Sequence, residues 1–192
     1  ATVCRVDFIF GKDFPYMSNM SPAAKKYKRL AVAALAAALT FLVVAFLQIP
    51  FPIGQGGYIN IGDAFIFLFA TLLPFPYGIA AAAVGPALAD VASGYAIYAP
   101  FTLLIKAAMA ACFDSRRRGC GARNLLGAAV AVVILVVGYY LADAILAGSF
   151  VVPLAAAPFN LIQGAVSAAL FAGLSYILEK SAFYAGLRDE LR

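Results

Sequence analysis

The chain has 192 residues, of which 65% are hydrophobic and 12% are charged, whereas roughly a quarter of residues are charged in an average soluble domain. This composition predicts an integral membrane protein and excludes a large soluble domain. The net charge of +5 is gathered in basic clusters beside apolar stretches, a pattern that indicates membrane orientation rather than nucleic-acid binding.

Apolar stretches of helical length predict an all-α integral membrane protein built as a bundle of six transmembrane helices. The expected helices span residues 30–47, 61–73, 77–94, 100–113, 124–147 and 157–178. The second and fourth are short for a hydrocarbon core of ~30 Å, so we expect tilting or local thinning of the bilayer to accommodate them.

A proline-rich interruption at residues 74–78 leaves two interpretations of the apolar run from 64 to 89, namely one kinked helix or a tight hairpin of two helices. The hairpin places the basic segments 25–29 and 116–123 on the same side of the membrane, in keeping with the positive-inside rule. We therefore favour the hairpin, with both termini in the cytoplasm and the protein in the plasma membrane.

This interpretation divides the chain into three parts. Residues 1–27 are expected to be a polar leader, residues 28–180 a six-helix membrane domain that binds substrate, and residues 181–192 a cytoplasmic tail.

Charged residues inside apolar stretches mark the candidate site, because a charge at membrane depth costs several kcal/mol and is rarely there without a partner or a task. Counting from the helix ends, the helices bring these residues, with amides and tyrosines, into one layer near the outer surface. Apolar and aromatic walls with a few convergent polar groups predict a small-molecule site. The candidate residues are Tyr58, Asn60, Asp63, Asp90, Tyr95, Tyr98, Lys106, Tyr139, Asp143, Asn160 and Gln163.

Structural interpretations of the same residues stay open. Asn60 could cap the second helix while Asp63 complements its dipole. Asp90 and Lys106 could form an interhelical ion pair, and the tyrosines could belong to an interfacial belt.

Several catalytic features are missing from the sequence. It contains no histidine and no GxxxxGK[ST] phosphate loop, and no serine or cysteine has an evident base partner. We expect no metal site, no cofactor and no enzymatic activity.

Four stretches together resemble the substrate-binding S component of energy-coupling factor (ECF) vitamin transporters, over roughly residues 30–179. The stretches are residues 58–63 (YINIGD), 87–106 (from ALAD to LLIK), 138–143 (GYYLAD) and 158–163 (PFNLIQ).

The resemblance implies a subunit that captures a vitamin from outside, with the loop after the first helix as a lid. Such a subunit associates with a transmembrane T component and two cytoplasmic ATPases that supply the energy. The family's AxxxA pattern, which contacts the T component, matches Ala33 and Ala37 in the first helix.

The charge of the polar layer limits the chemical class of the ligand. The layer contains three aspartates and one lysine, namely Asp63, Asp90, Asp143 and Lys106, so its formal charge is −2. This charge repels phosphorylated or dicarboxylate substrates and favours a neutral or weakly basic heterocycle. Hydroxymethylpyrimidine and pyridoxine fit best, and riboflavin is the third candidate. Two rival hypotheses remain: a stand-alone proton-coupled secondary transporter that uses Asp90 or Asp143, and a membrane protein whose polar layer only fixes helix register.

Overall fold

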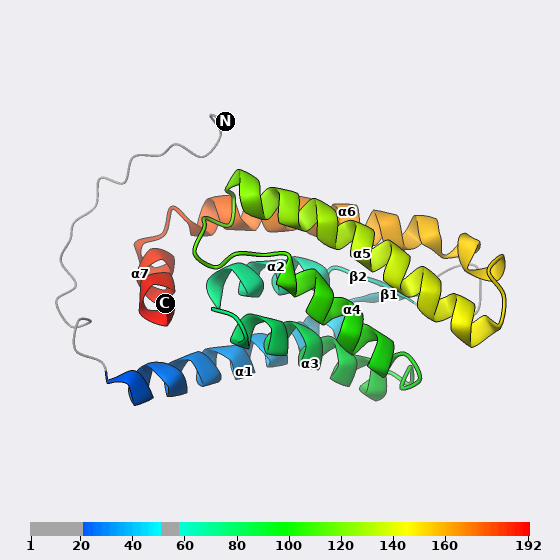
Figure 1. Ribbon diagram of the computed structural model, residues 1–192, viewed down its shortest axis with the longest axis horizontal. Helices are drawn as coiled ribbons and strands as arrows, with labels where there is room; N and C mark the ends of the chain where they lie inside the picture. The colour runs from blue at the N-terminus through cyan, green and yellow to red at the C-terminus, as the bar shows by residue number, and fades with distance from the viewer. Residues whose placement is uncertain (1–20, 51–57) are drawn as a thin grey trace.

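The computed structural model describes residues 21–50 and 58–192 and is helical apart from one short hairpin of strands (Figure 1). The elements are α1 (Pro22–Phe46), β1 (Gln48–Pro50), β2 (Tyr58–Asn60), α2 (Gly62–Leu72), α3 (Tyr77–Ala92), α4 (Ala99–Ala111), α5 (Ala122–Ala147), a 3-10 turn (Val152–Ala155), α6 (Ala157–Leu178) and α7 (Ala182–Leu191).

The long helices form an elongated bundle in which sequence neighbours are not always spatial neighbours. Helices α5 and α6 pack together along one side and α1 and α3 along the other, while α2 and α4 lie between these pairs (Figure 1). Strands β1 and β2 pair antiparallel, with Ile49 opposite Ile59, at the end of the bundle opposite α7 (Figure 1).

The interruption at residues 74–78 separates two helices, since α2 ends at Leu72 and α3 begins at Tyr77. The hairpin interpretation is therefore the correct one. Within residues 21–50 and 58–192, three helices, α1, α5 and α6, are long and apolar enough to cross a membrane, whereas α2, α3 and α4 are apolar but shorter. At 1.5 Å per residue the 11 residues of α2 cover only about 16 Å, so six full crossings stay a prediction.

Helix α1 begins earlier than expected. Ser21 accepts a hydrogen bond from the Ala24 backbone N–H, and Pro22 occupies the first turn, which is a favourable combination for a helix start. The last residues of the expected polar leader therefore belong to α1. Residues 1–20 of that leader lie outside the described part of the chain.

Small residues allow α1 and α3 to approach closely. A Cβ at Gly85 would lie 2.5 Å from the backbone oxygen of Ala37, so only glycine fits there. Ala33 and Ala37 pack against the core cluster, on the side of α1 that faces α3. The alanines of α1 that are exposed include Ala34 and Ala38, and the expected partner-docking pair is thus half-buried within the chain itself.

The C-terminal segment is a helix packed on the bundle, where the sequence suggested only a tail. Tyr184 and Leu191 of α7 are buried. Arg29 of α1 donates to the backbone oxygens of Leu191, at 2.7 Å, and Arg192, at 2.5 Å, and Arg192 donates to the Ser115 oxygen at 2.7 Å. The beginning of α1 and the end of the chain therefore lie on the same side, as the prediction for the two termini requires.

Candidate substrate-binding site

A pocket lies at the end of the bundle near the strand hairpin, where β2, the α3–α4 turn and parts of α5 and α6 meet. Except for Thr102, every residue lining it was expected from the sequence. Its lining consists of Tyr58, Asn60, Asp90, Tyr95, Tyr98, Thr102, Tyr139, Asp143, Asn160 and Gln163. Asp63 and Lys106 do not line it.

Asp90 forms one side of the pocket near the end of α3. It is buried, and its Oδ1 accepts a hydrogen bond of 2.5 Å from the Tyr58 hydroxyl. Its Oδ2 is also buried and has no hydrogen-bond partner in the described part of the chain. A buried carboxylate oxygen without a donor is costly, so this atom is the best-placed acceptor for a ligand.

Asp143 forms a second aspartate–tyrosine pair from the opposite side, on α5. Its Oδ1 accepts a hydrogen bond of 2.9 Å from the Tyr98 hydroxyl. Burial raises the pKa of both Tyr58 and Tyr98, and the negative charges of Asp90 and Asp143, respectively, raise it further. Both phenols therefore remain protonated and act as donors to the carboxylates.

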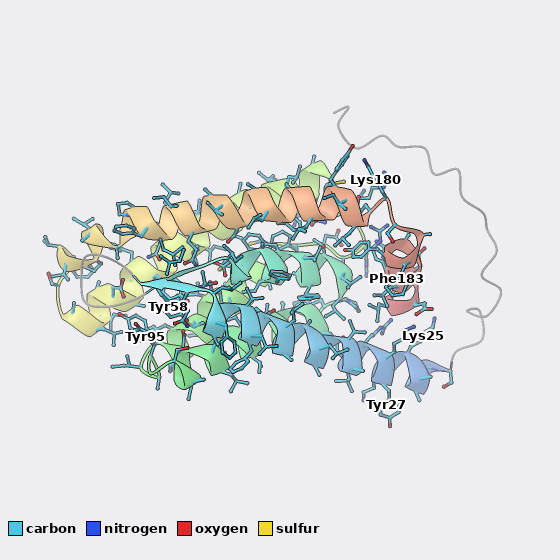
Figure 2. The ribbon with its side chains drawn as sticks, turned by 180° about the vertical axis from the view of Figure 1, so that it is seen from behind. Lys25, Tyr27, Tyr58, Tyr95, Lys180 and Phe183 are labelled. Atoms are coloured by element: carbon cyan, nitrogen blue, oxygen red, sulfur yellow. The ribbon has the colours of Figure 1, made fainter. Side chains whose placement is uncertain are left out.

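The turn after α3 positions Tyr95 above the pocket. Gly94 has a φ of +86°. The Tyr95 N–H donates to the backbone oxygen of Asp90 at 2.8 Å, and the Gly94 N–H donates to the backbone oxygen of Val91 at 3.4 Å. These features together make a Schellman motif at the end of α3. This turn brings the Tyr95 ring to 5.3 Å from that of Tyr58, with the planes tilted by 56°. Figure 2 shows both tyrosines at the hairpin end of the molecule.

Thr102 is the lining residue that the sequence analysis missed. It is buried in α4, and its hydroxyl lies 3.0 Å from that of Tyr139. Its position one turn before Lys106 on the same helix was a usable signal, because residues four apart share a helical face.

Lys106 pairs with Asp63 below the pocket, not with Asp90 as the ion-pair interpretation expected. The Lys106 Nζ lies 2.5 Å from Asp63 Oδ1, and both side chains are almost fully buried. Gln163 donates to Asp63 Oδ2 at 2.8 Å and accepts from the Asn60 N–H at 3.1 Å. This network ties α2, α4 and α6 to strand β2.

Asn60 also holds the start of α2, since its Oδ1 accepts from the Gly62 N–H at 2.9 Å. This bond closes a turn just before the helix, because the N-cap residue of α2 is Ile61 and no side chain makes a capping hydrogen bond there. The capping interpretation of Asn60 is therefore wrong, and Asn60 lines the pocket wall instead. Asp63, in contrast, is used by Lys106 and Gln163 rather than by the helix dipole alone.

With the Lys106–Asp63 pair set aside, the charged residues that line the pocket are Asp90 and Asp143. No cationic side chain of the described residues is among the lining. The cavity volume is about 50 Å³, far below the 300–1,000 Å³ typical of ligand pockets, so the pocket is narrow.

Comparison with known proteins decides the family. The family model described as "ECF-type riboflavin transporter, S component" matches residues 24–180. The chain belongs to this family. A solved structure described as "Structure and mechanism of the S component of a bacterial ECF transporter" has the same fold, with a TM-score of 0.63 at 19% identity over 80% of this chain and 96% of that one. No curated protein matches the chain.

Family membership confirms the resemblance drawn from the four stretches. The chain is an S component, a membrane protein of a transporter family whose members bind substrate, and the whole pocket falls within the matched range. Helix α7 lies beyond that range.

Proposed function

We propose that this S component captures riboflavin, or a neutral heterocycle much like it, in the pocket between Asp90 and Asp143 and passes it to an ATP-driven importer. The observation that carries the proposal is the buried, unpartnered Oδ2 of Asp90 in the pocket wall. Riboflavin now comes first because the matching family model is described by that vitamin. Hydroxymethylpyrimidine and pyridoxine, which the residues alone favoured, become the competitors in the test.

The chemistry of the wall suits such a ligand. Riboflavin is uncharged at neutral pH, offers ring N–H and hydroxyl donors, and has a flat ring system. Asp90 and Asp143 accept hydrogen bonds from those donors, and the Tyr58 and Tyr95 rings pack against the flat face. Because two carboxylates and no cation line the pocket, a phosphorylated form of the vitamin is repelled.

Ligand entry requires the pocket to open, since about 50 Å³ does not hold a ring system. The tyrosines above the pocket are the groups whose movement opens it, and two of them also occupy the aspartate acceptors through Tyr58–Asp90 and Tyr98–Asp143. We infer that the ligand replaces at least one of these tyrosine hydroxyls. The lid expected at residues 48–58 lies partly outside the described residues.

Quenching of riboflavin fluorescence by the purified full chain tests the substrate. We expect saturable quenching of riboflavin as the protein concentration rises, and at least tenfold weaker binding of flavin mononucleotide in the same titration because of its phosphate. Stronger competition by pyridoxine or hydroxymethylpyrimidine would transfer the proposal to that vitamin. Absence of binding by all four compounds would contradict the capture of a heterocycle.

Partner association is proposed through the exposed face of α1, which carries Ala34, Leu35 and Ala38. Small residues at four-residue spacing let a partner helix approach closely in lipid. Ala34→Trp is expected to abolish co-purification with a T component and spare riboflavin binding. Ala37→Trp is the comparison variant, and it should disturb the α1–α3 contact with Gly85 and lower stability.

Uptake measurements separate the ATP-driven importer from the proton-coupled alternative, in which Asp90 or Asp143 would titrate. Riboflavin uptake by cells should require the T component and both ATPases and should survive a protonophore when ATP is held constant. Uptake by the chain alone that collapses with the protonophore would favour the secondary transporter.

A further inference from the structure

A second and larger cavity lies at the opposite end of the bundle, between the α2–α3 turn and the loop that joins α4 to α5. Its volume is about 400 Å³, and its lining has two chemically different sides. Leu73, Phe75, Ile79 and Phe113 contribute to an apolar side, while Arg116 and Arg123 contribute to a basic one.

The loop that carries the basic side is held in place by its own hydrogen bonds. Asn124 is fully buried, and its side chain accepts from the Asp114 N–H at 2.8 Å and donates to the backbone oxygens of Asp114 and Arg118. Arg123 Nη1 donates to the Cys112 oxygen at 2.8 Å. A Cβ at Gly127 would lie 2.6 Å from that same oxygen, so α5 begins in close contact with the end of α4.

Binding capacity remains at this end after those contacts are made. The Arg116 side chain is exposed, and the hydrogen bond that Arg116 makes to Asp114 comes from its backbone N–H and not from its guanidinium. Asp114, the acidic lining residue, turns its Oδ1 to the Arg116 backbone N–H at 2.9 Å. Two guanidinium groups line the cavity, and the one carboxylate among the lining residues bonds to its own loop. The net charge of the cavity wall is therefore positive.

We propose that this cavity binds the phosphodiester head group of an anionic phospholipid, whose acyl chains lie along the apolar side. A guanidinium group matches a phosphate through paired N–H donors, and basic pockets between membrane helices suit anionic head groups. Phe75 lines the cavity and is 77% exposed, as an aromatic residue at a membrane interface is. The proposal does not rest on riboflavin capture, because the two cavities lie at opposite ends of α4.

Native mass spectrometry of the full chain in neutral detergent tests this site. The probes are phosphatidylglycerol and phosphatidylcholine with identical acyl chains. We expect the wild type to retain phosphatidylglycerol preferentially. Arg116→Gln should weaken that binding about fivefold, the effect of ~1 kcal/mol for one arginine near an anionic surface.

Arg117→Gln is the matched control. Arg117 has the same charge in the same loop, but it does not line the cavity and its side chain is 73% exposed. It should leave the binding of phosphatidylglycerol within twofold of the wild type. An equal loss in both variants would show only diffuse attraction by the basic loop and would overturn the site.

Ile79→Trp tests the apolar side without changing any charge, because the larger side chain fills the cavity. It should reduce phosphatidylglycerol binding while leaving riboflavin binding unchanged. Equal retention of the two lipids by the wild type would overturn the proposal. So would displacement of phosphatidylglycerol by millimolar sodium phosphate or glycerol 3-phosphate, which would identify a soluble phosphate as the ligand.

Discussion

The two ends of the bundle use polar side chains in opposite ways. At the hairpin end Asp90 and Asp143 accept hydrogen bonds from tyrosine hydroxyls, and Asp90 Oδ2 is buried without a partner among the residues that the structure describes. At the other end, where Figure 2 labels Lys25, Lys180 and Phe183, several charged groups bond to the protein's own backbone or to each other, while Arg116 lies in the wall of the second cavity.

Glu179 illustrates the second use. It accepts from the Gly119 N–H at 2.5 Å and pairs with Arg188 at 3.3 Å, while Arg29 and Arg192 donate to backbone oxygens. Contacts of this kind hold α7, α1 and the α4–α5 loop together. The difference teaches that an unpartnered buried polar group indicates a binding site only where it also lines a pocket, as Asp90 does.

The largest expected effect lies between the two ends, at the Lys106–Asp63 pair. Lys106→Met leaves Asp63 buried without its counter-ion, and we expect a loss of about 3–5 kcal/mol in the free energy of unfolding. The sequence marked Lys106 as a candidate ligand-binding residue, whereas in the structure it pairs with Asp63 and does not line the pocket. The midpoint of thermal unfolding measures the effect.

Two variants control the Lys106 experiment. Lys180→Met removes an exposed lysine at the basic end and should change the midpoint little. Asp63→Asn combined with Lys106→Met removes both charges and should recover much of the loss. A double variant no more stable than Lys106→Met would contradict the assigned pairing.

The second largest effect is expected on ligand binding at the hairpin end. Asp90→Asn and Asp143→Asn each keep the size of the side chain but remove the negative charge that accepts from the ligand. We expect riboflavin binding to weaken at least tenfold, about 1.4 kcal/mol, with the unfolding midpoint preserved. Asp114→Asn at the basic end is the control and should bind riboflavin normally. Unchanged affinity in both pocket variants would remove these residues from the site.

A smaller effect is expected where α7 is held at the basic end. Arg29→Gln removes the guanidinium that donates to the Leu191 and Arg192 oxygens. Because this group is partly exposed, we expect a cost of about 1 kcal/mol and faster proteolysis of the C-terminal segment. Riboflavin affinity should not change. A loss of affinity would show that the two ends are coupled.

The smallest effect is expected at the surface of α7. Asp189 pairs with Arg192 at 3.6 Å, but its side chain is 71% exposed. Solvent screens such pairs, so Asp189→Asn should leave the unfolding midpoint within the error of the measurement. A clear destabilisation would mean that α7 depends on its surface charges rather than on Tyr184 and Leu191.

Much of the fold and the candidate site could be predicted, because bilayer physics imposes strong rules on sequence. Uncharged runs predicted the helices, and the positive-inside rule favoured the break at residues 74–78 that the structure contains. Depth counting brought Asp90, Asp143 and Asn160 into one layer, and all three line the pocket. Helix α7 was missed because a short amphipathic segment resembles a polar tail when its packing surface is unknown.

The sequence by itself determined the class, the membrane environment and most of the polar residues that line the pocket, because the cost of a charge in lipid depends on composition and depth. Only the tertiary structure decided the partners. Lys106 pairs with Asp63 and not with Asp90, and Ala37 lies against Gly85 of α3. The depth of a residue can be counted along a single helix. Which side chains pair depends on how the helices rotate and pack against each other, and a residue count does not give that information.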